Sequence, residues 1–248
     1  MSLKTDKDNI YVIVPPVDTL DSITNFMKEN FTIFVRVKII GDKLPFNEDS
    51  FIFSRNGKHS GICVRRMENN DLSVSFSYWF SSNDGEDKNI YKNITFLLPN
   101  ELKNEFNDYV MICDQERKII SCYINNINIG AITYSGLIKE DYSKSFIWFG
   151  CGSMIVENKY KGIGEFEFEL SFALSDNINI NDIDHFKNTY MNYTKLLFDE
   201  LPVFNSSLEL KEKLIFFLDF DNKSKYKIWN YIFNGIFPQF YIENNIYF

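Results

Sequence analysis

The segment Asp108–Ile132, DYVMICDQERKIISCYINNINIGAI, decides the predicted fold of this chain. Its apolar residues recur at every second position, which is typical of strands with one buried face; they are Val110, Ile112, Ile120, Cys122 and Ile124. The charged stretch Asp114–Lys118 predicts a turn that sets Cys113 opposite Ile119 and Val110 opposite Cys122. Asn125–Asn126 predicts a two-residue turn, because asparagine tolerates the left-handed conformation that such a turn needs. The segment therefore predicts three consecutive strands.

The same alternation recurs along most of the chain. In Asp71–Phe80 one face carries Leu72, Val74, Phe76, Tyr78 and Phe80, and the other carries Ser73, Ser75, Ser77 and Trp79. In Glu165–Leu174 one predicted face carries Phe166, Phe168, Leu170 and Phe172, and the other carries Glu165, Glu167 and Glu169. Further strands are predicted at Ile10–Val14, Phe31–Ile40, Ser50–Ser54, Gly61–Arg66, Ile94–Leu98, Ser145–Phe149, Leu214–Phe220 and Tyr226–Tyr231. Helical spacing predicts one helix, at Asn181–Leu201. Many short strands separated by turns predict an all-β antiparallel sandwich or jelly roll.

Composition excludes several classes of function. The 248 residues are 45% hydrophobic and 17% aromatic, which is enough to fill a large core, and the formal net charge is -8. This charge argues against nucleic-acid binding, which needs clustered Lys and Arg. No apolar run approaches the ~18 residues of a membrane helix, so we expect no membrane insertion. The four cysteines form no C-x-x-C pair, and we expect four reduced thiols. Reduced thiols and the absence of a signal peptide in MSLKTDKDN favour the cytoplasm.

The order of these motifs resembles the laminin G-like, concanavalin A-like jelly rolls of lectins and glucanases. Tyr11–Pro15 is similar to that family's "Y-V-x-V-P" strand, and Phe31–Val37 to its "FTI-x-V-x-V" strand. Tyr123–Asn126 is similar to its "Y-V-N-G" turn, with Asn126 in place of glycine. Ile147–Gly150, Gly162–Leu170, Ala173–Ser175 and Asp182–Ile183 follow in the family's order. The resemblance covers about Ile10 to Tyr193 and implies a concanavalin A-like sandwich with one short helix in its C-terminal half.

The C-terminal segment departs from the family's order. Such folds often begin with a strand and a turn, but we expect almost nothing of the sandwich before Ile10. The segment Leu214–Phe248 instead looks like that opening piece moved to the end of the chain. We therefore predict a single domain over residues 10–248, in which 10–193 carries the family's motifs and 194–248 completes the sandwich with its strands. The alternative is that Leu214–Phe248 begins a second repeat.

Trp79 marks the first candidate site. It shares a strand face with Ser75 and Ser77, and an aromatic ring on a polar face suits stacking against a sugar, with hydroxyl groups binding its polar edge. Arg36 would join this face if Phe31–Ile40 lies in the same sheet, and Arg65 and Tyr123 are further candidates. The competing interpretation places Trp79 under a loop or under the C-terminal segment. No cofactor is expected at this site.

Two weaker signals concern catalysis and metal. Glu165, Glu167 and Glu169 form E-x-E-x-E, and laminarinase-type hydrolases of the same superfamily carry E-x-D-x-E. Here the central residue is Glu and no Trp flanks the motif, so a solvated acidic face is the competing interpretation. Asp84, Glu86 and Asp87 offer oxygen ligands for Ca²⁺, although their spacing is not that of an EF-hand, and an acidic surface turn competes.

These observations predict a non-catalytic, lectin-like carbohydrate-binding module whose partner is a glycan or a glycosylated molecule. Such a module could serve as an accessory domain of a larger protein that processes or synthesises glycans. One alternative is a protein–protein interaction module of the laminin G-like type. The other is a glycoside hydrolase that uses Glu165, Glu167 and Glu169. The structure can distinguish these three functions. An exposed cleft beside Trp79 would favour carbohydrate binding, a flat apolar patch would favour protein binding, and a groove with Glu165 and Glu167 at its floor would favour hydrolysis.

Overall fold

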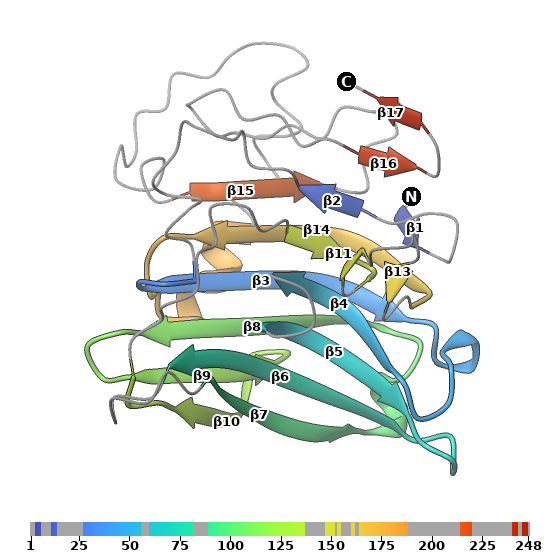
Figure 1. Cartoon of the computed structure of the whole chain (residues 1–248), viewed down its shortest axis with the longest axis horizontal. Coiled ribbons are helices and arrows are strands. Elements are labelled where there is room, and N and C mark those ends of the chain that lie inside the picture. Colours follow the sequence, from blue (N-terminus) through green and yellow to red (C-terminus); the bar gives the residue numbers. More distant parts are fainter. Residues whose placement is uncertain are drawn as a thin grey trace.

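A computed structural model describes residues 3–5, 11–13, 27–55, 60–81, 89–136, 147–151, 153–154, 160–161, 164–187, 214–219, 240–242 and 245–247. In this part of the chain two mostly antiparallel sheets pack face to face (Figure 1). Helix in the described residues is confined to three 3-10 turns and one helical turn at 183–187; the 3-10 turns are η1 (Gly41–Lys43), η3 (Asn100–Leu102) and η5 (Ile180–Asp182). The predicted all-β sandwich of jelly-roll type is confirmed.

The first sheet has seven strands. In order across the sheet they are β1 (Leu3–Thr5), β14 (Phe166–Leu174), β3 (Phe31–Ile39), β8 (Phe106–Asp114), β9 (Ile119–Ile124) and β10 (Ile127–Thr133), with β15 (Leu214–Asp219) also paired to β14. The segment Asp108–Ile132 supplies most of β8, all of β9 and most of β10. Asn125 and Asn126 both have positive φ, 49° and 64°, so the predicted two-residue turn is confirmed.

The β8–β9 register is one residue away from the prediction. Cys113 pairs with Ile120 rather than Ile119, and Val110 pairs with Tyr123 rather than Cys122. The reason is that Asp114 still belongs to the ladder, opposite Ile119, so the turn is limited to 115–118 and closes through Lys118 at φ 56°. The four cysteines are nevertheless unpaired and buried, as predicted.

The second sheet has six strands and lies in front in Figure 1. In order they are β2 (Tyr11–Ile13), β11 (Ile147–Phe149), β4 (Asp49–Arg55), β5 (Ser60–Arg66), β6 (Leu72–Ser81) and β7 (Asn89–Leu98). Two short ribbons complete the described strands, namely β12 (Ser153–Met154) with β13 (Tyr160–Lys161), and β16 (Phe240–Ile242) with β17 (Asn245–Tyr247).

The main core lies between the two sheets and follows their alternation. The inward residues of β6 are buried, and they are Leu72, Val74, Phe76, Tyr78 and Phe80. They meet the inward residues of the seven-stranded sheet, among them Ile33, Val35, Val37, Tyr109 and Met111. Burying this apolar area is the dominant favourable term in folding, and it commits the other face of β6 to the outside of the sandwich.

Strand β14 differs from the predicted alternation because it contains a β-bulge. Phe168 pairs with Val37 and Leu170 pairs with Arg36, so Glu169 is an extra residue between them. A bulge reverses the faces of all residues that follow it. Phe166 and Phe168 therefore enter the main core, whereas Leu170 and Phe172 do not. The prediction that these four share one face is wrong.

The residues beyond the bulge form a second core on the outer face of the seven-stranded sheet. Its buried members are Phe34, Val110, Ile112, Leu170, Phe172, Leu174, Ile183 and Phe186. Phe34 and Phe172 stack with ring centroids 4.8 Å apart and planes 10° apart. Ile183 and Phe186 come from the helical turn at 183–187, which is thus held over the sheet by apolar contact.

The edge of β14 is shared by the two ends of the chain (Figure 1). Strand β15 pairs with Leu170–Leu174, so the expected pairing of the C-terminal segment with the sandwich is confirmed over Leu214–Asp219. Strand β1 pairs with Phe166–Phe168. The expectation that almost nothing precedes Ile10 is therefore corrected, because β1 already belongs to the sheet. The predicted strand Tyr226–Tyr231 and the predicted helix beyond residue 187 lie outside the described residues, and the predicted domain limits stay a prediction.

Candidate functional site

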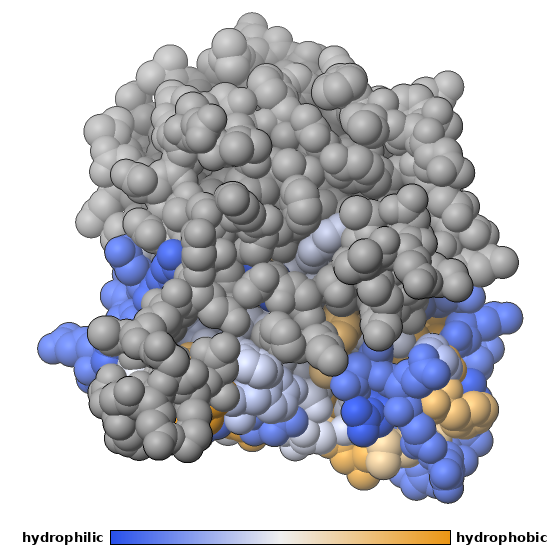
Figure 2. Space-filling model, in the orientation of Figure 1, coloured by the Kyte–Doolittle hydropathy of each residue, from blue (hydrophilic) through white to orange (hydrophobic). Residues whose placement is uncertain are grey.

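The outward residues of β6 and β7 form the candidate site. Each outward residue of β6 is paired across the ladder with one of β7: Ser75 with Thr95, Ser77 with Asn93, and Trp79 with Tyr91. We call these six residues the β6–β7 face. Figure 2, which has the orientation of Figure 1, shows a pale area of intermediate hydropathy in the region of these strands. Hydroxyl, amide and aromatic side chains are thus brought together on one side of the sheet.

Two aromatic rings lie at one end of the β6–β7 face. The ring centroids of Trp79 and Tyr91 are 5.9 Å apart and their planes are inclined by 58°. Tyr91 is 45% exposed and Trp79 is partly exposed. Partial burial raises the pKa of the Tyr91 phenol, against hydrogen bonds with Ser77 and Asn93 that lower it. The Tyr91 side chain is therefore a phenol with a raised pKa and an exposed ring.

The polar residues of the face divide into two groups. Ser75 and Thr95 share a hydrogen bond of 2.9 Å between their hydroxyl oxygens and remain partly open to solvent. Ser77 is only 1% exposed, and its hydroxyl donates to the Gly61 carbonyl at 3.4 Å. A buried hydroxyl that is engaged by the protein is poorly placed to contact a ligand. Ser77 therefore lies within the sheet rather than open on its surface, and direct ligand binding by Ser77 stays a prediction without support from its burial.

Arg65 belongs to the same side of the sheet but lies at its far end. It pairs with Ser73 of β6, six positions from Trp79, which corresponds to roughly 20 Å along a strand. Its guanidinium binds the Asp49 carboxylate, with Nη2 2.8 Å and Nε 2.9 Å from Oδ1. The structure therefore does not bring Arg65 together with the aromatic pair.

Arg36 and Tyr123 lie on the opposite side of the molecule. Strand β3 belongs to the seven-stranded sheet, so the condition under which Arg36 would join the face of Trp79 is not met. Tyr123 packs against the second core. The sequence could not separate the two sheets, because both present alternating apolar and polar residues. Neither residue belongs to the β6–β7 face.

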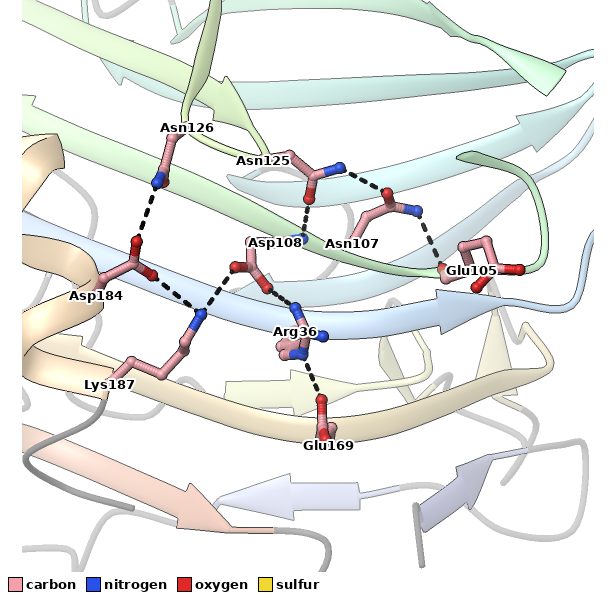
Figure 3. Close-up of polar contacts among 9 residues, drawn as sticks. All are labelled: Arg36, Glu105, Asn107, Asp108, Asn125, Asn126, Glu169, Asp184 and Lys187. Carbon is pink, nitrogen blue, oxygen red and sulfur yellow. Dashed lines mark hydrogen bonds and ion pairs between the residues drawn. The ribbon is translucent and has the colours of Figure 1, made fainter. Parts of the chain in front are cut away.

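Arg36 is instead the centre of an ion-pair network (Figure 3). Its Nη1 lies 2.8 Å from Asp108 Oδ1, and its Nε donates to Glu169. Lys187 of the helical turn lies 3.3 Å from Asp108 Oδ2 and 3.0 Å from Asp184 Oδ1. Burial lowers the pKa of Arg36, but the two carboxylates more than offset this and raise it overall. The network ties β14, β3 and β8 to the segment that covers the second core.

Two of the three glutamates of the E-x-E-x-E motif, Glu167 and Glu169, are partners of cations. Glu167 Oε1 lies 3.0 Å from Lys4 Nζ, Glu167 Oε2 lies 3.9 Å from Lys38 Nζ, and Glu169 binds Arg36. Glu165 accepts the Ile40 backbone N–H through its main-chain carbonyl at 3.1 Å. A retaining glycosidase directs two carboxyl groups at one substrate, whereas here Glu167 and Glu169 are directed at separate cations. This geometry favours structural ion pairs over catalysis.

The predicted calcium ligands Asp84, Glu86 and Asp87 lie outside the described residues, and calcium binding there stays a prediction. Among the residues that are described, no group of three or more His, Cys, Asp or Glu side chains could hold a metal ion. In the same part of the chain, no helix combines the length and the apolarity needed to span a membrane.

Three residues of the β6–β7 face were not predicted from the sequence to belong to the site, namely Tyr91, Asn93 and Thr95. Strand β7 was expected to begin at Ile94 but begins at Asn89. The alternation Tyr91, Asn93, Thr95, Leu97 was the available signal. It was obscured by Lys92, which occupies a position where an apolar residue is expected. Lys92 lies on the edge strand β7, and its ammonium group donates a hydrogen bond to the Thr133 carbonyl at 2.7 Å.

No known protein family and no curated protein matches this chain. Among solved structures it is similar to a heptameric SAP-like pentraxin from Limulus polyphemus, with 10% identity over 72% of this chain and 81% of that one, at a TM-score of 0.41. It is also similar to the botulinum neurotoxin serotype D binding domain, with 16% identity over 75% of this chain and 42% of that one, at a TM-score of 0.43. For the botulinum neurotoxin serotype G binding domain the identity is 16% over 66% of this chain and 37% of that one, at a TM-score of 0.44. The chain spans less than half the length of these neurotoxin domains.

Proposed function

We propose that this chain is a non-catalytic, lectin-like carbohydrate-binding module of concanavalin A-like, laminin G-like type, and that its site is the β6–β7 face. The observation that carries the proposal is the aromatic pair of exposed Tyr91 and partly exposed Trp79 beside neutral hydrogen-bonding groups. A sugar ring presents C–H groups on its faces and hydroxyl groups around its edge. Aromatic rings pack against the C–H groups of the sugar, and Ser75, Thr95 and Asn93 are placed to hydrogen-bond its hydroxyl groups.

The size of the site sets the expected affinity. Stacking one sugar on one ring removes on the order of 100 Å² of apolar surface from water, which stabilises the complex by about 2–3 kcal/mol at ~25 cal/mol/Å². A few hydrogen bonds add to this, and immobilising the sugar subtracts from it. We therefore expect dissociation constants in the range from about 1 mM to tens of micromolar for short oligosaccharides. Attachment to a larger protein acting on glycans would raise the effective affinity through multivalency.

The alternative of a protein-binding module has less support on this face. Protein interfaces are built around contiguous apolar patches. In the described part of the chain, the large apolar side chains exposed by more than a third are Phe46, Met67, Tyr91, Leu97 and Ile127. Of these, Tyr91 and Leu97 are on the outer side of β7, and they are separated by Asn93 and Thr95. Alternating apolar and polar side chains suit a sugar better than a flat protein interface.

The test is a glycan array followed by calorimetry with the purified chain. Trp79→Ala and Tyr91→Ala should each weaken binding at least tenfold. Phe46→Ala, which removes an aromatic ring that is 52% exposed away from this face, is the matched control and should leave affinity unchanged. Absence of binding to any glycan, or binding that neither Trp79→Ala nor Tyr91→Ala weakens, would contradict the proposal.

Stability measurements make this test specific to the surface. Phe76 is fully buried on the inner face of β6, and Phe76→Ala should cost ~3–5 kcal/mol through lost burial and a cavity. Trp79 is on the outer face of the same strand, and Trp79→Ala should cost about 1 kcal/mol, near the centre of the usual mutant distribution. Equal destabilisation by the two substitutions would mean that the Trp79 ring is structural.

A further inference from the structure

The inclination of the two rings and the charge of their surroundings restrict the kind of glycan that fits. Building on the proposed carbohydrate site, we infer that the β6–β7 face binds a single, soluble, neutral glycan chain, and that it discriminates against flat crystalline polysaccharide and against anionic glycans. Three features of the described residues support this: the geometry of the rings, the rigidity of the strands beside them, and the charge of the neighbouring side chains.

The first feature is the angle between the rings. A flat polysaccharide surface can lie flush on two rings only when their planes are nearly parallel to it and to each other. The planes of Trp79 and Tyr91 are 58° apart, so a surface that is flush with one ring meets the other at a steep angle. A single chain has no such constraint, because one sugar can stack on one ring while its neighbour turns across the second. The ring geometry therefore excludes the flat surface and admits the free chain.

The separation of the rings adds to this restriction. A sugar held between two parallel rings needs about 3.5–4 Å to each ring, or roughly 7–8 Å between them. The Trp79 and Tyr91 centroids are 5.9 Å apart, so the rings contact each other and leave no slot for a sugar. A sugar can therefore occupy only the outer surface of the pair. Its polar edge is then directed along the strands toward Ser75 and Thr95.

The second feature is the rigidity of this arrangement. Ser77 and Asn93 pair across the β6–β7 ladder next to the pair of Trp79 and Tyr91, and Ser77 is buried and donates to the Gly61 carbonyl. The Trp79 backbone N–H donates to the Ser60 hydroxyl at 3.3 Å. Both bonds fix β6 to β5 beside the rings, and turning Tyr91 flat would move its ring away from that of Trp79. Ser77 is thus a positioning residue next to the rings, and a rigid site loses less free energy on binding.

The third feature is that none of the described side chains beside the rings is a free cation. The described groups that adjoin the rings on the β6–β7 face are neutral, namely Ser75, Asn93 and Thr95. Among the described residues on this side of the sheet, Arg65 is neutralised by Asp49 at 2.8 Å, and the chain as a whole carries a net charge of -8. A bound carboxylate or sulfate would lose hydration without gaining a cationic partner. An anionic glycan should therefore bind more weakly than its neutral analogue.

The test compares chemically matched glycans in different physical states. Cellohexaose, chitohexaose and mannohexaose are the soluble neutral probes, and crystalline cellulose, chitin and mannan are their insoluble counterparts. Carboxymethyl cellulose and oligomannuronate are the anionic probes. We expect at least one soluble neutral hexaose to bind at least tenfold more tightly than both its crystalline and its anionic counterpart, with an affinity that does not change between 50 and 500 mM salt. Preference for a crystalline or anionic form, or a steep salt dependence, would overturn the inference.

A second variant isolates the role of the ring angle. Tyr91→Phe keeps the ring and removes the hydroxyl, whose polar neighbours are Ser77 and Asn93. It should leave unfolding unchanged within error, weaken soluble-chain binding about threefold to tenfold, and reduce the ratio of soluble to crystalline binding. An unchanged ratio would contradict the positioning role. Failure of every neutral and anionic glycan to bind the unmodified chain in any form would instead refute the carbohydrate function itself, and this inference with it.

Discussion

Replacing Arg36 by methionine distinguishes a structural cation from a ligand-binding one. Arg36 was a candidate site residue, but the structure places it in a network with Asp108 and Glu169 on the sheet opposite the β6–β7 face. Methionine keeps much of the length and apolar character of the side chain and removes its charge. We expect Arg36→Met to destabilise the fold and to leave glycan binding unchanged.

The magnitude follows from distance and exposure. Two charges about 4 Å apart attract by ~4 kcal/mol at an effective dielectric constant of about 20. The side chains of Arg36 and Glu169 are each 31% exposed and that of Asp108 is 11% exposed, so solvent screening and side-chain ordering remove much of this. Asp108 also has Lys187 at 3.3 Å, and Glu169, which loses its cation, is 31% exposed and can be hydrated, so no charge is left both buried and unpaired. We expect a loss of about 1–2 kcal/mol, below the ~3–5 kcal/mol of a stranded buried charge.

Urea unfolding measures this loss, with Arg36→Met and Asp108→Asn combined in a double-mutant cycle. The coupling energy between the two sites should be about 1 kcal/mol and should decrease in high salt. Lys38→Met is the matched control on the same strand. Lys38 lies 3.9 Å from Glu167, and its loss should cost less than about 0.5 kcal/mol. Wild-type stability of Arg36→Met, or loss of glycan binding in a stable Arg36→Met protein, would refute the structural role.

Three further predictions concern the cores and the chain ends. Phe172→Ala should lower the free energy of unfolding by ~3–5 kcal/mol, as much as Phe76→Ala, because Phe172 is fully buried in the second core and stacked on Phe34. A loss below about 1 kcal/mol in urea unfolding would mean that this cluster is not a core. Burial raises the pKa of Cys63, Cys113, Cys122 and Cys151 to about 12, above the value of about 8.5 for an unfolded thiol. The buried protonated thiols therefore contribute fully to the free energy of unfolding below pH ~8.5. As the pH rises toward 12 the unfolded thiols ionise first, and this contribution is lost by up to about 1.4 kcal/mol per pH unit for each thiol. A urea midpoint that stays constant from pH 8 to 10 under reducing conditions would contradict this. Deleting residues 214–248 should abolish cooperative unfolding because β15 pairs with β14, and thermal melting at the temperature of the intact chain would show that this pairing is dispensable.

The parts of the fold that could be predicted from the sequence are those governed by local rules. Alternation placed the strands, because a strand with one buried face needs an apolar residue at every second position. It also assigned Trp79 and Ser75 to the outside of β6, which is the origin of the candidate site. Asn125 and Asn126 identified their turn because few other residues tolerate positive φ. These signals lie within a few residues of the structure they specify.

The tertiary structure alone decided which faces meet. The bulge at Glu169 is a feature of the pairing between β14 and β3, and it sends Phe172 to a second core although the alternation of the sequence is unbroken. The β8–β9 register depended on whether Asp114 belonged to the turn or to the ladder, which side-chain type does not determine. The assignment of Arg36 and Trp79 to opposite sheets, and of Tyr91 to the side of Trp79, depended on strand pairing between distant segments. The sequence determined the two faces of a regular strand such as β6, because apolar and polar residues alternate along it. Only the folded chain determined which polar sides lie together, because that depends on contacts between residues far apart in the sequence.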